Sequence, residues 1–204
     1  MSTFKNASGK TILMKMVKGI QENKAYLGEV DGLIGDGDHG MNMNKGFTVF
    51  ENRFSDKEFS FTEGLDELGT ILLNEIGGSM GPIYGTILMD MAEAGEDLEE
   101  IGVSDFAKML RAGLKGLCEI VDARVGDKTL VDTLSPAVDV MEEAAEAGKN
   151  FAEALSEMKH AAETGRDSTK DMVAIWTFQS AGRTFKRSFG CRSNIMLHYF
   201  AIYG

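Results

Sequence analysis

The stretch SDFAKMLRAGLKGLCEIV, residues 104–121, decides the fold class. Ser104 is the expected N-cap of a helix here, because a serine hydroxyl can accept a hydrogen bond from a free N–H group of the first turn. Apolar residues then recur three or four positions apart, the spacing that gathers them on one face of an α-helix. These residues are Phe106, Met109, Leu110, Leu114, Leu117 and Val121.

Other parts of the chain show the same helical spacing. The stretch from Ile12 to Ile20 repeats it, and residues 127–132 are expected to start a helix that carries Leu130 and Leu134. The chain holds only two prolines, and we find no internal repeat or linker. We therefore expect an all-α, single-domain bundle of antiparallel helices joined by short loops. Further helices are expected over residues 41–54, 62–76, 82–94 and 151–164.

Composition excludes several classes of partner. The net charge of −11 predicts a surface that repels the phosphates of nucleic acids and of anionic membranes. Cys118 and Cys191 have neither zinc-site nor disulfide-framework spacing. Residues 1–10 lack the apolar core of a signal peptide, and no apolar run approaches membrane-spanning length. We expect a cytoplasmic protein with no nucleic-acid or membrane partner.

A loop rich in aspartate and glycine, residues 31–40, is the first candidate site. Asp31, Asp36 and Asp38 fall within eight residues, and His39 follows them. Such close carboxylates repel one another and need a counter-ion. Oxygen ligands without cysteine favour magnesium or calcium over zinc, and magnesium commonly joins carboxylates to substrate phosphates. The sequence predicts a magnesium site that serves a nucleotide.

Three other interpretations of this loop agree less well with its residues. Aspartate and glycine also make ordinary turns and caps, although three aspartates exceed what a turn requires. The glycines at 35, 37 and 40 match a dinucleotide-binding pattern, but residues 26–31 show no strand before them. An EF-hand is excluded because Gly40 and Phe47 occupy its fifth and twelfth positions.

The second candidate site is the glycine-rich stretch from Gly77 to Gly85. Its glycines leave backbone N–H groups open to an anion, and Pro82 suits the first turn of a following helix. The same glycines would equally allow two helices to pack closely. Both interpretations remain open, and the nearby aspartate loop favours the phosphate site. His160 is expected to be solvated and is assigned no role.

Three ordered motifs together resemble the ADP-binding L subunits of phosphotransferase-type dihydroxyacetone kinases. They are Ile34 to Asn42, Gly77 to Thr86, and Gly126-Asp127-Lys128-Thr129, and the match runs from the N-terminus to about Asp171. The resemblance implies a barrel of about eight antiparallel helices that holds a nucleotide and two magnesium ions at one end. It implies that the metals are bound by Asp31, Asp36 and Asp38, and that the nucleotide contacts are His39, Gly40, Met41, Asn42, Gly78, Ser79, Met80 and Leu130.

The resemblance also implies a function. In such kinases ADP stays bound, a phosphohistidine subunit of the phosphotransferase system phosphorylates it, and the ATP formed phosphorylates dihydroxyacetone on a ketose-binding kinase subunit. No residue of this chain is then expected to be a catalytic nucleophile or base. Leu130 would lie near the base. Met80 replaces a small hydroxyl residue, so only its backbone N–H remains for the phosphate.

The C-terminal tail, residues 175–204, departs from the family. All 32 acidic residues lie at or before Asp171, and the tail is basic. The family motif Gly-Arg-Ala-Ser-x-Leu-Gly-Glu-Arg-Ser-x-Gly and the following Asp-Pro-Gly are missing. Codons for Ile175 to Cys191, read one nucleotide later, can spell Tyr-Gly-Arg-Ser-Ser-Arg-Leu-Gly-Glu-Arg-Ser-Arg-Gly-Pro-Leu-Asp-Ala, which recovers that motif. We therefore expect a nucleotide-binding domain over residues 1–174 and a frameshifted end of that domain, with a divergent basic tail as the alternative.

Two other functions remain open. The chain could be the detached nucleotide-binding domain of an ATP-dependent dihydroxyacetone or related kinase. It could also be a non-catalytic nucleotide-sensing or interaction module.

Overall fold

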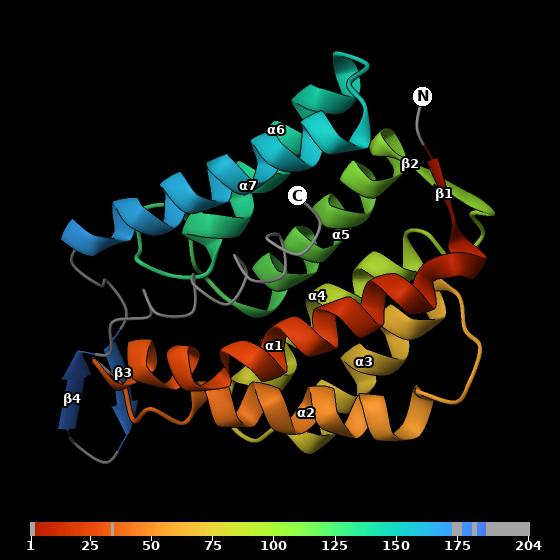
Figure 1. Cartoon of the computed structure of the whole chain (residues 1–204). Helices are drawn as coiled ribbons and strands as arrows, with labels where there is room; N and C mark the ends of the chain where they lie inside the picture. The colour runs from red at the N-terminus through yellow and green to blue at the C-terminus, as the bar shows by residue number, and fades with distance from the viewer. Residues whose placement is uncertain (1–2, 34, 173–176, 181–182, 187–204) are drawn as a thin grey trace.

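The chain forms a bundle of helices, as the sequence predicts (Figure 1). The computed structural model describes residues 3–33, 35–172, 177–180 and 183–186. These residues hold seven α-helices, so the all-α class is confirmed. The elements are β1 (Thr3–Lys5), a 3-10 helix (Asn6–Ser8), α1 (Gly9–Gly32), α2 (His39–Phe54), α3 (Phe61–Glu75), α4 (Met80–Glu93), β2 (Glu100–Gly102), α5 (Val103–Ile120), α6 (Val131–Glu146), α7 (Phe151–Ser168), a second 3-10 helix (Thr169–Asp171), β3 (Thr177–Ser180) and β4 (Arg183–Lys186).

Two helix starts differ from the sequence predictions. Ser104 is not the N-cap of α5, because this helix begins at Val103 after Gly102. The Gly102 N–H donates to Asp105 Oδ2 at 3.1 Å, so the side chain of the third helical residue satisfies it. The helix expected from residue 127 begins only at Val131, because residues 126–129 form a loop around the Asp132 carboxylate.

Consecutive helices run antiparallel and pack against each other along the chain, and α1 also packs on α3 (Figure 1). The α1–α2, α3–α4 and α5–α6 connections consequently lie at the same end of the bundle. We call this the loop end. Both glycine-rich candidate sites and the Gly126–Thr129 motif fall there.

Aromatic rings and a short sheet close the opposite end. β1 pairs with β2, with Phe4 opposite Ile101. The Phe4 ring meets the rings of Phe61 at 5.3 Å and Phe151 at 5.8 Å, and Phe106 lies 6.1 Å from Phe151. Such ring pairs add about 0.5–1.5 kcal/mol each beyond their buried area. They join the N-terminal strand to three helices far apart in sequence, which stabilises the bundle away from the loops.

The expected tail, residues 175–204, lies largely outside the described residues. Its described part is an antiparallel pair, β3 and β4, with Thr177 opposite Lys186. Among the described residues, no helix is both long and apolar enough to cross a membrane.

Helices α3 and α4 touch through their backbones. A Cβ at Gly81 would lie 2.6 Å from the Leu72 carbonyl oxygen, and one at Gly85 would lie 2.9 Å from the Gly69 carbonyl oxygen. Gly77, in the connecting loop, has no such neighbour within 4 Å. The glycine-rich stretch therefore contains helix-packing glycines and loop glycines side by side.

This division predicts opposite outcomes for two substitutions. Gly81→Ala should lower the free energy of unfolding by about 1–3 kcal/mol, because backbone carbonyls cannot yield to the methyl group. This cost exceeds the roughly 0.5–1 kcal/mol that alanine gains over glycine in a helix. Gly77→Ala is the matched control and should leave stability within about 0.5 kcal/mol. Urea denaturation of both variants measures the difference, and equal stabilities would show that α4 is not held by this contact.

Candidate functional site

The α1–α2 loop folds around the side chain of Asp31. The Gly35 N–H donates to the Asp31 carbonyl oxygen at 2.5 Å, and the Gly37 N–H donates to Asp31 Oδ2 at 2.9 Å. A Cβ at Gly35 would lie 2.7 Å from Asp31 Oδ1, and Gly37 has a φ of +76°. Glycine is therefore required at both positions, by close approach at Gly35 and by the left-handed backbone at Gly37.

This loop brings the three predicted metal ligands together. One carboxylate oxygen from each of Asp31, Asp36 and Asp38 lies within 4.8 Å of the other two. Asp31 is buried, whereas Asp36 and Asp38 are exposed. Over the described part of the chain, no other group of three or more His, Cys, Asp or Glu has this geometry. An all-carboxylate donor set with two open members fits a hard divalent cation that also binds a ligand from outside.

Electrostatics at the cluster agree with this geometry. Burial raises the pKa of the Asp38 carboxyl above its ordinary value, and the neighbouring carboxyls of Asp36 and Asp31 raise it further. Asn42 acts in the opposite direction, since its Nδ2 donates to Asp38 Oδ2 at 2.8 Å. The three carboxylates therefore repel one another as the residue-type pattern predicts, and a cation would relieve this repulsion.

The residues after Asp38 turn the loop into α2. His39 is 3% exposed, and its ring meets that of Tyr84 from α4 edge-on. Gly40 is buried against α1, where a Cβ would lie 2.0 Å from the Lys24 carbonyl oxygen. Met41 is 61% exposed. Of the predicted contacts His39 to Asn42, Gly40 therefore has a packing role, and Met41 projects from the loop end.

The α3–α4 loop forms the second part of the site. Gly78 has a φ of +73° and open space where a side chain would be, and Ser79 is exposed as the N-cap residue of α4. The first N–H groups of a helix have no acceptor within it, so they face outward and favour an anion. Pro82 lies in the first turn of α4, as predicted.

Met80 and Leu130, two of the predicted nucleotide contacts, have buried side chains. Their side chains are 6% and 4% exposed and belong to the hydrophobic core. Met80 is the first residue of α4, so its backbone still belongs to the helix N-terminus.

Asp132 organises the third loop and was missed as a functional-site residue in the sequence. Its carboxylate accepts hydrogen bonds from the Gly126 N–H and the Thr129 N–H, both at 2.6 Å, and the residue is 1% exposed. Lys128 has a φ of 61°, and its Nζ donates to the Met172 carbonyl oxygen at 3.1 Å. The Gly126–Thr129 motif thus links α5 and α6 to the residues that follow α7.

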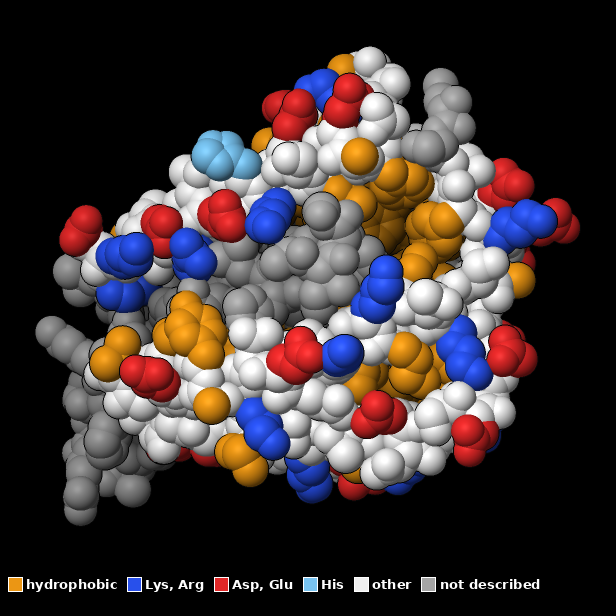
Figure 2. All heavy atoms as spheres, viewed as in Figure 1, with side chains coloured by type: hydrophobic (Ala, Val, Ile, Leu, Met, Phe, Trp, Pro, Cys, Tyr) orange, Lys and Arg blue, Asp and Glu red, His pale blue; other side chains and the backbone are white. Residues whose placement is uncertain are grey.

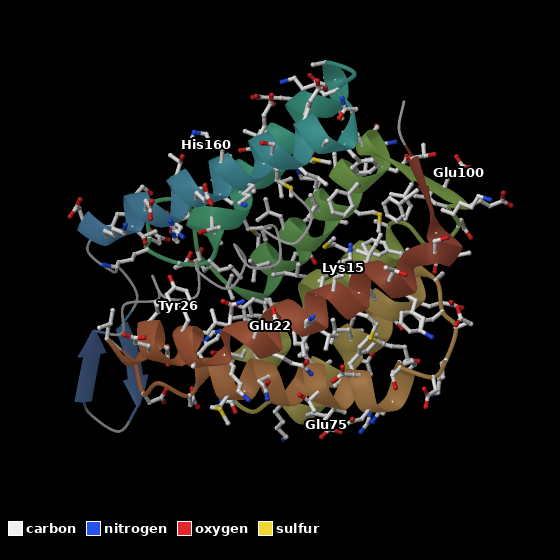
Figure 3. All side chains as sticks on the ribbon, in the orientation of Figure 1. Lys15, Glu22, Tyr26, Glu75, Glu100 and His160 are labelled. Carbon is white, nitrogen blue, oxygen red and sulfur yellow. The ribbon has the colours of Figure 1, made fainter. Side chains whose placement is uncertain are left out.

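Two labelled side chains show how the helices are placed relative to the loops (Figure 3). His160 is exposed on α7, as expected for a solvated residue. Tyr26 lies on α1 toward the loop end. On the face seen in Figure 2, acidic and basic side chains are interspersed.

Comparisons with known proteins agree with the fold and the motifs. The model of the DAK2 domain family matches residues 33–190. The ADP-binding subunit DhaL of the PEP-dependent dihydroxyacetone kinase 1 of Listeria innocua is 36% identical over 123 residues, which are 60% of this chain and 62% of that subunit. The corresponding subunit of Escherichia coli is 33% identical over 152 residues, which are 73% of this chain and 71% of that subunit.

A solved structure shows the same fold. It is the dihydroxyacetone kinase of C. freundii in complex with AMP-PNP and Mg²⁺, with a TM-score of 0.70 and 18% sequence identity. The likeness covers 99% of this chain and 34% of that one, so the chain spans about a third of that kinase and less than two thirds of the Listeria subunit. Since the family model covers more than half of the sequence, the chain belongs to the DAK2 domain family, the family of the DhaL subunits of dihydroxyacetone kinases.

Proposed function

We propose that this chain is the nucleotide-binding subunit of a dihydroxyacetone kinase. It holds ADP or ATP with magnesium at the loop end and relays a phosphoryl group from a phosphotransferase-system partner to dihydroxyacetone on another subunit. The observation that carries the proposal is the set of three carboxylates within 4.8 Å at the end of the bundle where α4 begins with an open glycine loop. The named relatives support it, since they are ADP-binding subunits of PEP-dependent kinases.

In this proposal each loop has a separate task. Asp31, Asp36 and Asp38 hold the magnesium, with two ions as the number that the family resemblance implies. Gly78, Ser79 and the start of α4 direct backbone N–H groups at the phosphates. Bound magnesium would neutralise phosphate charge and offer Lewis acidity to the transferred group.

The site needs no catalytic base for this task. Phosphoryl transfer depends mainly on alignment and on stabilisation of charge on the phosphate oxygens. The described loops supply carboxylates for metal and N–H groups for phosphate. The acceptor hydroxyl and the phosphohistidine would come from the partner subunits.

Exposed apolar side chains at the loop end suit such partners. Large hydrophobic residues are exposed in or within one turn of the three loops, and Tyr26 lies less than two turns from the first. Exposed apolar residues gathered around a site are typical of a protein-binding surface. We define this loop-end rim as Tyr26, Leu33, Met41, Leu73, Ile120 and Val125.

A second candidate function is a detached domain of an ATP-dependent kinase, which would exchange ATP freely. The C. freundii kinase favours it, because this fold corresponds to about a third of a kinase solved with AMP-PNP and Mg²⁺. The apolar rim favours the subunit role in a multi-chain kinase.

Substitution of an aspartate tests the metal site. Asp36→Asn should weaken magnesium-dependent ADP binding more than about tenfold, because an unmade contact to a charged group costs about 1.5–3 kcal/mol. Without metal, Asp36→Asn and Asp38→Asn should melt no lower than the wild type, because one repelling charge is gone. Asp66→Asn, at an exposed position on α3, is the control. Titration calorimetry that finds unchanged magnesium and ADP affinity in both site variants would show that these aspartates are only turn residues.

Reconstitution tests the relay. Mixed with a phosphohistidine subunit and a ketose-binding subunit, the chain should pass phosphate from phosphoenolpyruvate to dihydroxyacetone without exchanging its nucleotide with free ATP. Leu33→Glu should keep magnesium–ADP affinity and lower relay at least about tenfold, because a charge on the exposed rim disrupts docking. Ser156→Glu, at an exposed position on α7 away from the loops, is the control. Turnover only with added ATP would select the detached-domain function instead.

We also infer that residues 1–174 are the nucleotide-binding domain and that the basic tail is its frameshifted end. Restoring the shifted reading after Ala174 should tighten ADP binding more than about tenfold, because an arginine–phosphate contact is worth about 1.5–3 kcal/mol. Sequencing the coding DNA is the first measurement. If the bases after the Ala174 codon spell the family motif in no reading frame, the tail is a divergent in-frame ending and not a frameshift. The family match up to residue 190 would then include part of that divergent ending.

A further inference from the structure

Tyr84 is a buried tyrosine that connects two loops of the site. It is 2% exposed and lies in the second turn of α4. Its hydroxyl oxygen is 3.5 Å from His39 Nε2, and the two rings meet edge-on with centroids 5.9 Å apart and planes at 89°. At this distance the hydroxyl and the imidazole can share a hydrogen bond, whose direction depends on the tautomer of His39.

The direction of Tyr84 follows from the glycines of α4. Gly81 and Gly85 turn one face of the helix against the backbone of α3, with Cβ positions within 2.9 Å of its carbonyl oxygens. Such close contact leaves α4 little freedom to rotate about its axis. Tyr84 directly precedes Gly85 on a neighbouring face and is thereby directed at the start of α2.

His39 links this contact to the metal ligands. It is the first residue of α2 and is bonded directly to Asp38. Gly40, the next residue, is packed against the Lys24 carbonyl oxygen of α1. His39 therefore joins a closely packed helix start to Asp38 through the backbone, and a hydroxyl that holds its ring also limits the movement of Asp38.

We propose that Tyr84 is a positioning residue whose hydroxyl holds His39 and thereby keeps the aspartate loop in register with the glycine loop at the start of α4. The inference rests on the proposed function, because the register matters only for a ligand that bridges both loops. ADP alone would engage mainly the glycine loop. Magnesium–ADP would engage both, and it binds more tightly when their spacing is set beforehand.

Tyr84 should accordingly contribute to the coupling between magnesium and ADP rather than to ADP affinity itself. Coupling is the factor by which magnesium increases the affinity for ADP. The distance of 3.5 Å is long for a hydrogen bond, and contacts of this kind commonly shorten when the ligand binds.

The test compares Tyr84→Phe with Ser156→Ala, which removes a hydroxyl from an exposed position on α7, away from the loops. ADP affinity is measured by calorimetry with magnesium and again with EDTA. In Tyr84→Phe the coupling should fall about 3- to 10-fold, the range that one net hydrogen bond covers, with ADP affinity in EDTA unchanged. Ser156→Ala should match the wild type in both conditions. An equal loss of affinity with and without magnesium would show that Tyr84 only supports the fold, and would overturn the proposal.

A second readout needs no nucleotide. The chain has three histidines, so the imidazole nitrogens can be assigned by ¹⁵N NMR. Tyr84→Phe should shift the Nε2 resonance of His39, whereas Ser156→Ala should not. If both the His39 resonance and the magnesium–ADP coupling are unchanged in Tyr84→Phe, the role of Tyr84 is overturned and the proposed function is not. Failure of the wild type to bind magnesium–ADP would instead overturn the proposed function, and with it this role of Tyr84.

Discussion

One carboxylate oxygen from each of Asp31, Asp36 and Asp38 lies within 4.8 Å of the other two, so the loop must hold three negative charges close together. Carboxylates at such distances repel, and the repulsion raises the pKa of Asp38 beyond the effect of burial. The loop keeps them together through backbone hydrogen bonds to Asp31, through the close approach of Gly35 to Asp31, and through the left-handed backbone of Gly37. The arrangement is costly without a cation, and this cost supports the proposal that the loop binds a metal.

The bundle supplies the stability that such a site requires. At the end away from the loops, Phe4, Phe61, Phe106 and Phe151 meet ring to ring, and β1 pairs with β2. At the loop end, helices approach closely through glycines, as at Gly40 against α1 and Gly81 against α3. Backbone contact of this kind sets the spacing of neighbouring helix starts with little tolerance. The aromatic contacts thus stabilise the bundle at one end, and the glycine contacts fix the spacing of the helices that carry the loops at the other.

Much of this could be predicted from the sequence, for physical reasons that particular residues show. Helical spacing in residues 104–121 reports burial directly, so it predicted α5 to within two residues. The aspartate cluster was found because residue type and short spacing are both local. Ser104 was the wrong N-cap because the start of α5 is set by the β1–β2 pairing and by Asp105.

Other features depend on contacts between distant residues. The choice between phosphate binding and helix packing for residues 77–85 could not be made from composition, since Gly77 and Gly81 differ only in what lies opposite them. Tyr84 gave no signal because His39 is 45 residues away in sequence. Asp132 did give a sequence signal, since a carboxylate three residues after Thr129 can accept a hydrogen bond from a backbone N–H group of the loop before a helix.

We propose that the aspartate loop and the glycine loop hold one magnesium–nucleotide complex between them. Replacing magnesium with Mn²⁺ tests this, because pulsed electron paramagnetic resonance records the hyperfine coupling of the bound ion to phosphorus. Strong ³¹P coupling is expected when ADP is present in the wild-type protein, and the bound Mn²⁺ should be lost when Asp31 is replaced by asparagine. Bound Mn²⁺ without phosphorus coupling, or the same coupled signal after that substitution, would show that the two loops do not share one complex.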